Sequence, residues 1–449
     1  MNVPKTIFKS YDIRGLAQGE LSQELARRVG AAVVRLTGAK RLVVGRDMRE
    51  TSPAFAEAVV GGAMAEGAHV VDIGLCSTPL FNFAVTHYPD HDAGVMVTAS
   101  HNPVAYNGFK IVRHDGTVVG GGDGMEAVAE FVLSDAPVSD HAAGSVTSLN
   151  VEEEYLQEIF SQSAPLPDLS GFVVAVDAGN GMGSLVLRPL FEKLGCAWQG
   201  LYLDPDGRFP NHEANPLKEE TLHDIRRLME TAHAHVGIAL DGDGDRVVFL
   251  DETGAVIRGD HIIAMLAPDI LRRYPGGKIY YDLRSTRRVA EAVTSAGGVP
   301  VMSEVGHANF KRHLVRDGGV FGGEFSCHFF FKEFGSAEAS EYMIVLLLSH
   351  LARSGKKLSE LVAPFRTPHS GEINFEVADR EAALARVVER YGGVAKQRLD
   401  IDGVSFFFDG WWFNLRPSNT EPLVRLTLEA DSAELMEQKK AEISSLVAV

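Results

Sequence analysis

The chain has 449 residues, which is long for a single compact core and predicts three or four domains. Its apolar fraction of 45% and charged fraction of 23% are those of an ordinary globular protein. Asp and Glu number 60 against 43 Lys and Arg, so the formal net charge is -17. This balance argues against broad binding to nucleic acid or to an anionic membrane, and an anionic small ligand would need a local basic pocket.

The three cysteines, Cys76, Cys196 and Cys327, are far apart and form no spacing typical of a metal site or a disulfide framework. Residues 1–10 contain no apolar core of a secretion signal, and the longest apolar run, residues 343–348, is much shorter than a bilayer span. We therefore expect a protein of the reducing cytoplasm that is neither secreted nor embedded in a membrane.

The first part of the chain alternates between helix and strand patterns. Apolar residues repeat every three to four positions over residues 25–36, which predicts a helix that ends at Gly38. Short apolar runs predict strands at residues 42–44, 70–73 and 95–97. This alternation favours a parallel sheet with functional loops at the strand ends. A polar stretch at residues 134–148 marks the first boundary, so domain I is predicted at residues 1–147.

The alternation of strand and helix patterns begins again twice along the chain, and the C-terminal part then shows a different pattern. An apolar run at residues 172–176 predicts a strand, and the glycine cluster that follows it does not have the spacing of a dinucleotide-binding loop. Further strands are predicted at residues 279–281 and 299–302. Residues 372–377 and 404–408 instead indicate an antiparallel sheet with helices. The predicted fold class is α/β, with three similar mixed α/β domains and a C-terminal α+β domain around a central active-site cleft. The predicted domain ranges are 1–147, 148–252, 253–367 and 368–449.

The strongest single motif is DGDGDR at residues 241–246, directly after the predicted strand 236–240. Carboxylates at alternate positions, with glycines between them, can turn onto one hard cation, and oxygen-only ligands favour Mg²⁺ or Ca²⁺. We reject an EF-hand because Arg246 stands where its loop needs glycine and because the flanking residues resemble strands. Three acidic ligands suit a Mg²⁺ that still accepts a substrate oxygen, whereas the alternative is a solvated acidic turn. The predicted metal ligands are Asp241, Asp243 and Asp245.

A second motif, TASHNP at residues 98–103, ends the apolar run of residues 95–97. Such a run predicts a buried strand that delivers its last side chains onto a loop, so we expect Ser100 to be presented rather than hidden. Pro103 restricts the preceding residue and stiffens the loop where a nucleophile would need a fixed position. On these residues alone, an ordinary turn is an equally good interpretation.

Two later clusters carry groups suited to a phosphorylated sugar. Glu324 and Ser326 are two residues apart in GGEFSCH, and in an extended chain both would point to one side, toward neighbouring sugar hydroxyls. A structural loop is at least as good an interpretation of that stretch. RPSNTEP at residues 416–422, with Arg425 beyond it, combines a guanidinium, two hydroxyls and backbone amides in a proline-bracketed turn. These groups are what a phosphate dianion requires.

Taken together, these four motifs resemble those of the α-D-phosphohexomutases, in the same order and over essentially the whole chain. The third and fourth motifs are most similar to the bacterial phosphomannomutase/phosphoglucomutase group. The resemblance implies an isomerase that interconverts hexose 1-phosphate and hexose 6-phosphate, of mannose and/or glucose, through phospho-Ser100 and a hexose 1,6-bisphosphate. It also implies Mg²⁺ bound by the three aspartates together with Ser100, and the bisphosphate as activator and intermediate.

The same resemblance implies roles for further residues. Arg14 and Arg246 would stabilise charge, because a guanidinium does not lose its proton, and Lys110 is the favoured acid and base, with a surface lysine as its alternative interpretation. The implied catalytic residues are Ser100, His101, Lys110, Arg14, Arg246 and His307. The implied substrate-binding residues are Tyr11, Glu324, Ser326, His328, Arg416, Ser418, Asn419, Thr420 and Arg425.

The sequence departs from the family pattern at two places, and the first of them leaves the choice between glucose and mannose phosphates open. Cys327 stands where relatives usually carry glycine, and residues 335–340 replace an Asp-rich segment. Phosphoglucosamine mutases share all four motifs and are therefore an alternative. Two further alternatives are a serine-dependent phosphatase, which would release inorganic phosphate, and a sugar-phosphate-binding protein without chemistry. The expected partners are small hexose phosphates rather than nucleic acid or membranes. The sequence does not decide the oligomeric state, for which we expect a monomer or weak dimer.

Overall fold

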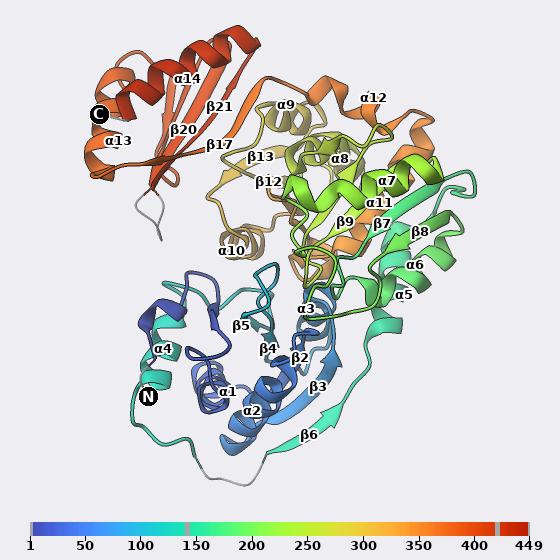
Figure 1. Cartoon of the computed structure of the whole chain (residues 1–449), viewed down its shortest axis with the longest axis vertical. Helices are drawn as coiled ribbons and strands as arrows, with labels where there is room; N and C mark the ends of the chain where they lie inside the picture. Colours follow the sequence, from blue (N-terminus) through green and yellow to red (C-terminus); the bar gives the residue numbers. More distant parts are fainter. Residues whose placement is uncertain (1–2, 140–143, 418–422, 448–449) are drawn as a thin grey trace.

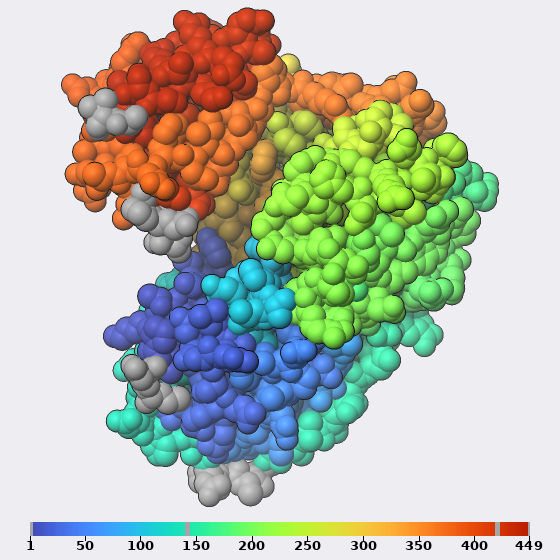
Figure 2. Space-filling model, viewed as in Figure 1, coloured from blue at the N-terminus to red at the C-terminus, as the bar shows by residue number. Residues whose placement is uncertain are grey.

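The structure is a computed structural model that describes residues 3–139, 144–417 and 423–447. Four sheets follow one another along the chain, three with helices packed around them and a fourth at the C-terminal end (Figure 1). The predicted fold class is therefore confirmed. Figure 2 shows a face of the molecule that is hollowed between the fourth unit, in orange and red, and the first unit, in blue. No helix among the described residues is both long enough and apolar enough to cross a bilayer.

The first sheet is mixed, with strand order β1-β5-β4-β2-β3-β6. Strands β4, β2, β3 and β6 run parallel, as the sequence predicts, but β5 is antiparallel to β4 and to β1. The short connection from β4 to β5 carries Ser100 and leaves no room for a crossover helix, so the two strands pair as a hairpin. The elements are β1 (Ile13–Leu16), α1 (Gln23–Thr37), β2 (Arg41–Arg46), α2 (Ser52–Ala65), β3 (His69–Leu75), α3 (Thr78–His87), β4 (Ala93–Val97), β5 (Tyr106–Arg113), α4 (Met125–Leu133) and β6 (Ser145–Ser148).

The second sheet has the order β11-β10-β9-β7-β8. Strands β9 and β10 form an antiparallel hairpin in which Leu240 pairs with Val247, so DGDGDR is the tip of a hairpin and not a loop between helices. The elements are α5 (Glu152–Ser163), β7 (Val173–Asp177), α6 (Ser184–Leu194), β8 (Ala197–Leu201), α7 (His223–Ala232), β9 (Val236–Leu240), β10 (Val247–Leu250) and β11 (Val256–Ile257).

The third sheet has the order β13-β12-β14-β15-β16. Glu324 and Ser326 lie in the turn that joins the antiparallel strands β14 and β15, where the Cys327 amide donates to the Glu324 carbonyl at 3.0 Å. The expectation of an extended chain at this point is wrong, because a hairpin this short must reverse direction there. The elements are α8 (Gly259–Arg273), β12 (Lys278–Asp282), α9 (Arg288–Ser295), β13 (Val299–Ser303), α10 (His307–Asp317), β14 (Phe321–Gly323), β15 (Phe329–Phe331), β16 (Ala337–Glu338), α11 (Ser340–Ser354) and α12 (Leu358–Val362).

The fourth sheet is antiparallel throughout, with the order β17-β21-β20-β19-β18, as its alternating sequence pattern predicts. Its apolar core, shared with α13 and α14, is separate from the continuous core that joins the first three units. The elements are β17 (His369–Glu376), α13 (Arg380–Tyr391), β18 (Gln397–Leu399), β19 (Val404–Phe408), β20 (Trp411–Pro417), β21 (Leu423–Ala430) and α14 (Ala433–Val447).

One buried arginine holds the loop between β4 and β5. The Arg49 side chain is 2% exposed, and its Nε lies 3.2 Å from Asp47 Oδ2. Its two terminal nitrogens donate to four backbone carbonyls of the loop, those of Ser100, Asn102, Pro103 and Tyr106, at 2.6 to 2.9 Å. Because hydrogen bonds from a charged donor are stronger than neutral ones, Arg49 fixes the path of the backbone on both sides of Ser100.

Helices α1 and α2 approach so closely that glycine is required between them. A Cβ atom on Gly62 would lie 1.8 Å from the carbonyl oxygen of Arg27, whereas a Cβ on the neighbouring Gly61 would meet no atom within 4 Å. We expect Gly62→Ala to lower the free energy of unfolding by about 1–3 kcal/mol, because the helices must separate. Gly61→Ala is the matched control and should be neutral or stabilising by up to about 1 kcal/mol. Denaturant titration measures both, and equal effects would contradict the close approach.

We expect Arg49→Met to loosen the Ser100 loop, because it leaves buried carbonyl oxygens without their donor at about 1–3 kcal/mol each. Hydrogen exchange followed by mass spectrometry should show faster exchange of the amides of residues 100–106. Arg41→Met removes the same charge from an exposed ion pair on the preceding strand β2 and should leave these amides unchanged. Unchanged exchange in the Arg49 variant would show that the loop does not depend on this side chain.

Candidate functional site

Three hairpin turns from three different sheets meet at one cavity. They are the Ser100 loop between β4 and β5, the aspartate loop between β9 and β10, and the turn between β14 and β15. The cavity has a volume of about 210 Å³ and is lined by Lys9, Tyr11, Asp12, Arg14, Ser100, His101, Lys110, Asp245, Arg246, His307 and His328. All six residues that the sequence analysis named as catalytic therefore line the same space.

Ser100 lies between an acceptor and an imidazole. Its Oγ donates to Asp241 Oδ2 at 3.0 Å and lies 3.0 Å from His101 Nδ1. The residue is only 4% exposed, and it is presented to the cavity from within the junction of two loops rather than to bulk solvent. A Cβ on Gly242 would lie 2.5 Å from the Ser100 carbonyl oxygen, which explains why glycine separates the first two aspartates.

The backbone at Ser100 has φ of 50°, in the left-handed region that a side chain rarely adopts. Residues held in such conformations cost free energy and persist where the surroundings impose them, often at functional sites. The hydrogen bonds from Arg49 and from the Ser100 amide to Thr98 Oγ1, at 2.9 Å, supply that restraint. The serine hydroxyl is therefore held in one position.

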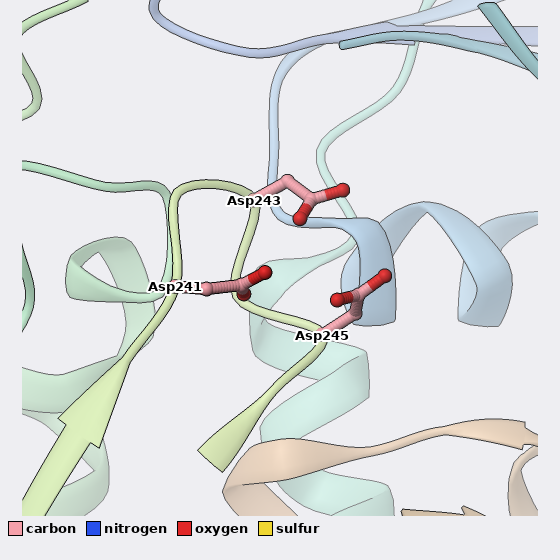
Figure 3. A group of neighbouring side chains, drawn as sticks. All are labelled: Asp241, Asp243 and Asp245. Atoms are coloured by element: carbon pink, nitrogen blue, oxygen red, sulfur yellow. The ribbon is translucent and has the colours of Figure 1, made fainter. Parts of the chain in front are cut away.

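The three aspartates project from one side of their loop (Figure 3). One ligand oxygen from each of Asp241, Asp243 and Asp245 lies within 4.8 Å of the others, and all three residues are buried. Burial, together with the charges of Asp245 and Asp243, raises the pKa of Asp241 to about 8. Asp243 Oδ1 is buried and has no hydrogen-bond partner among the described residues. A buried set of carboxylate oxygens that repel one another, among them the unpartnered Asp243 Oδ1, fits a hard divalent cation such as Mg²⁺.

Lys110 compensates part of this negative charge. Its Nζ lies 2.6 Å from Asp243 Oδ2 and 2.7 Å from Asp245 Oδ2. Burial by itself disfavours the ammonium, but the two carboxylates outweigh burial and raise the pKa of Lys110 above its ordinary value. The alternative interpretation as a surface lysine is wrong, since the residue is 5% exposed.

Two arginines make the wall of the cavity near Ser100 electropositive. Arg14 donates to Asn102 Oδ1 at 2.9 Å, and Arg246 Nε lies 4.0 Å from Asp241 Oδ2. Burial, followed by the positive charges of Arg246 and Arg14, lowers the pKa of His101 to about 2. His101 is therefore neutral beside the Ser100 hydroxyl.

His328 joins the turn between β14 and β15 to the aspartate loop. Its Nδ1 lies 2.8 Å from Glu324 Oε2, and its Nε2 lies 3.2 Å from Asp245 Oδ1. Burial alone would lower the pKa of His328, but Asp245 and the hydrogen bonds to both carboxylates raise it to about 9. Ser326 Oγ lies 3.3 Å from the same Nδ1, so the three residues form one group.

Cys327, in the same turn, has φ of 65° and is 3% exposed. A left-handed conformation is the one that glycine adopts at least cost, so the cysteine side chain occupies a backbone position that would suit glycine.

His307 begins α10 and contacts groups from two other elements. Its ring centroid lies 5.4 Å from that of Tyr11, and its Nδ1 lies 3.6 Å from Glu338 Oε1. The other Glu338 oxygen forms an ion pair with Lys311 Nζ at 2.6 Å and accepts from Asn82 Nδ2 at 3.0 Å. Glu338 and Lys311 were not among the residues predicted from the sequence. The only signal was the departure from the family pattern at residues 335–340.

The predicted phosphate turn is described only at its two ends. Ser418, Asn419 and Thr420 lie outside the described residues, whereas Arg416 and Arg425 face each other across β20 and β21. Tyr11, which lines the cavity, donates to the Val305 carbonyl at 3.1 Å. Burial first, then the charges of Glu324 and Asp402, raise the pKa of Tyr11, while the charge of Arg416 lowers it.

Comparison with known proteins gives the same picture over the whole chain. Models of the phosphoglucomutase/phosphomannomutase α/β/α domains I, II and III match residues 5–133, 153–254 and 258–367, and the model of the C-terminal domain matches residues 372–446. A protein of Xanthomonas campestris pv. campestris named "Phosphohexose mutases" is 39% identical over 443 residues, which is 98% of each chain. A phosphomannomutase of Salmonella montevideo is 37% identical over 454 residues, which is 98% of this chain and 99% of that one.

Among solved structures, a phosphoglucomutase/phosphomannomutase family protein from Burkholderia thailandensis superimposes with a TM-score of 0.90 at 31% identity, covering 99% of this chain and 97% of the other. An N-acetylphosphoglucosamine mutase from Aspergillus fumigatus, with a TM-score of 0.64 at 15% identity over 98% of this chain and 95% of that one, shares the fold. The family models and the curated relatives together cover the whole architecture described above. The chain thus belongs to the phosphoglucomutase/phosphomannomutase family, the phosphohexomutase isomerases that its four motifs resemble.

Proposed function

We propose that this enzyme interconverts the 1-phosphate and the 6-phosphate of mannose and/or glucose through phospho-Ser100 and a hexose 1,6-bisphosphate. The observation that carries the proposal is the position of Ser100 Oγ, 3.0 Å from both Asp241 Oδ2 and His101 Nδ1, in a cavity whose lining includes two arginines and three histidines. A hydroxyl held this firmly beside a cation-binding carboxylate is suited to carrying a phosphoryl group.

In the proposed reaction the phosphoryl group moves from Ser100 to a free hydroxyl of the hexose phosphate. The bond between phosphorus and Ser100 Oγ breaks, a bond from phosphorus to the sugar oxygen forms, and the hydroxyl proton passes to a base in the cavity. The bisphosphate then turns over, and its other phosphate returns a phosphoryl group to Ser100. The same residues serve both directions, so the cavity must accept either end of the sugar.

Asp241, Asp243, Asp245 and an oxygen of phosphorylated Ser100 would hold Mg²⁺, which when bound supplies positive charge to the transferring phosphoryl group. Arg14 and Arg246 add fixed positive charge on the cavity wall. Lys110 is held as an ammonium by two of the aspartates, so it is placed to donate a proton, and it must leave that ion pair before it can accept one.

Residues farther from Ser100 would hold the parts of the substrate that do not react. Arg416, Arg425 and the turn residues Ser418, Asn419 and Thr420 would bind the second phosphate, and Glu324, Ser326 and His328 would bind sugar hydroxyls. Charge-assisted hydrogen bonds from guanidinium groups favour a phosphate dianion. Two separated anion sites are what a reaction through a bisphosphate requires.

Mannose phosphate is favoured as a substrate because several full-length relatives are named phosphomannomutases at 35–37% identity. Phosphoglucosamine mutase activity is the alternative within the same enzyme class, and turnover of the mannose, glucose and glucosamine phosphates separates the two. We further propose that the enzyme works in the cytoplasm as a monomer or weak dimer, with small hexose phosphates as its partners.

We expect Ser100→Ala to reduce mutase activity at least about a thousandfold, because the group that carries the phosphoryl is gone. Intact-mass analysis should show a species one phosphoryl group heavier for the parent enzyme and none for the variant. Ser184→Ala, on α6, is a control that should keep both the heavier species and the activity. An active Ala variant would indicate another nucleophile. Absence of turnover in the parent enzyme would favour a binding protein, and release of inorganic phosphate without isomerisation would favour a phosphatase.

We expect removal of divalent cations with a chelator to abolish activity and added Mg²⁺ to restore it. Asp243→Asn should raise the Mg²⁺ concentration needed for half-maximal activity at least about tenfold, because one of the anionic ligands is lost. The measurement is a Mg²⁺ titration of initial rates. Full activity in the presence of the chelator would contradict the assignment of the aspartate loop.

A further inference from the structure

Glu372 lies among three arginines that come from two units of the molecule. Arg416 Nη2, on β20, donates to Glu372 Oε2; Arg425 Nη1, on β21, lies 3.7 Å from Oε1; and Arg284 Nη1, after β12, lies 4.0 Å from Oε2. Both carboxylate oxygens thus face guanidinium groups. Three guanidinium groups converge on the two carboxylate oxygens, and this arrangement would also suit the oxygens of a phosphate dianion.

The backbone of β17 aims Glu372 toward this cluster. The pairing of β17 with β21 shifts register between His369 and Glu372, and Gly371 has φ of 67°. A bulge of this kind re-aims the side chain that follows it. The Ser370 hydroxyl accepts from the Leu428 amide at 2.9 Å across the bulge, which fixes the distortion in place.

The arginines have supports that do not involve Glu372. Arg284 donates to Asp282 Oδ2 from Nη2 at 2.6 Å and from Nε at 3.2 Å, and Arg416 Nη1 lies 3.5 Å from Asp402 Oδ2. The side chain of Arg416 is 5% exposed and that of Arg284 11%, whereas that of Glu372 is 26% exposed. Glu372 is therefore more accessible to solvent than these two guanidinium groups, and its departure leaves them held by other carboxylates.

The cluster is also placed beside the sugar turn. The Arg284 guanidinium lies 5.5 Å from the centroid of the Phe325 ring, and the Phe325 amide donates at 2.8 Å to Asp282, the carboxylate that also holds Arg284. A hexose whose hydroxyls reach Glu324 and Ser326 would bring its second phosphate toward these arginines.

We propose that Glu372 is an internal counter-anion, which occupies the arginine cluster when no substrate is bound and is displaced by the phosphate group of a hexose phosphate. This inference rests on the proposed function, because that reaction requires one phosphate to leave the cluster and the other to enter it in the middle of each cycle. Bare guanidinium groups would hold a dianion tightly. A nearby carboxylate that returns as the phosphate leaves neutralises the arginine cluster again. It therefore lowers the affinity of the cluster for phosphate and favours exchange of one phosphate group for the other.

A purely structural role for Glu372 predicts the opposite result. If the carboxylate served only to hold the arginines in position, its removal would spread them and weaken phosphate binding. If it competes with phosphate, its removal strengthens binding. The sign of the change in affinity therefore separates the two roles.

The first test uses inorganic phosphate as the probe and isothermal titration calorimetry with a chelator present, so that the aspartate loop holds no cation. We expect Glu372→Gln to lower the Kd for phosphate about tenfold, as a charged competitor is replaced by a neutral one. Glu376→Gln makes the same charge change at an exposed position of the same strand and should leave the Kd unchanged. In the double variant Glu372→Gln/Arg416→Gln the gain should disappear. An unchanged or higher Kd in the Glu372 variant would overturn the proposal.

The second test is kinetic and uses a hexose phosphate. Glu372→Gln should lower both KM and kcat, because substrate binds more tightly and the intermediate exchanges its phosphate groups more slowly. If Glu372 only held the arginines in position, the same substitution would raise KM. Glu372→Asp, which keeps the charge on a shorter side chain, should restore much of kcat. A raised KM without rescue by Asp would again overturn the proposal. If the enzyme proves to have no mutase activity, the calorimetric test still measures the competition, so the two proposals fail independently.

Discussion

The site is organised by the repulsion among three buried carboxylates on one hairpin tip. Asp241, Asp243 and Asp245 could not remain ionised together without positive charge and hydrogen-bond donors from outside their own loop. Lys110 on β5, the Ser100 hydroxyl on the adjoining loop and His328 on the third hairpin supply them. The three turns are thus held in contact by charge compensation, and the same compensation creates a place for a divalent cation.

Much of this arrangement could be predicted from the sequence, for reasons that lie in local chemistry. Alternate aspartates separated by glycines restrict what a loop can do, and the apolar runs before DGDGDR and TASHNP identify these motifs as strand ends. Apolar alternation also distinguished the antiparallel fourth sheet from the first three units. These features depend on neighbouring residues in the chain, which is the information that a single sequence carries.

Features set by tertiary contacts could not be predicted in the same way. Strand β5 and its antiparallel pairing with β4 were not predicted, and neither was the enclosure of Ser100 at the junction of two loops. Glu324 and Ser326 lie in a turn where an extended chain was expected. Four further residues make their contacts with groups that are distant in sequence, and nothing near them in the chain indicates those contacts. They are Arg49, Glu338, Lys311 and Glu372. The length of the connection between β4 and β5 was the one signal that could have revealed the first hairpin.

The separate apolar core of the fourth unit has a consequence for how the molecule can move. The contacts described between this unit and the third are polar or aromatic, such as those of Arg287 with Glu429 and Asp431 and the stacking of Phe325 on His369. Water can replace such contacts at a modest cost in free energy, whereas exposing an apolar core that two units share would cost much more. The fourth unit can therefore change its position relative to the other three at a lower free-energy cost than those three, which share one apolar core, can separate from one another.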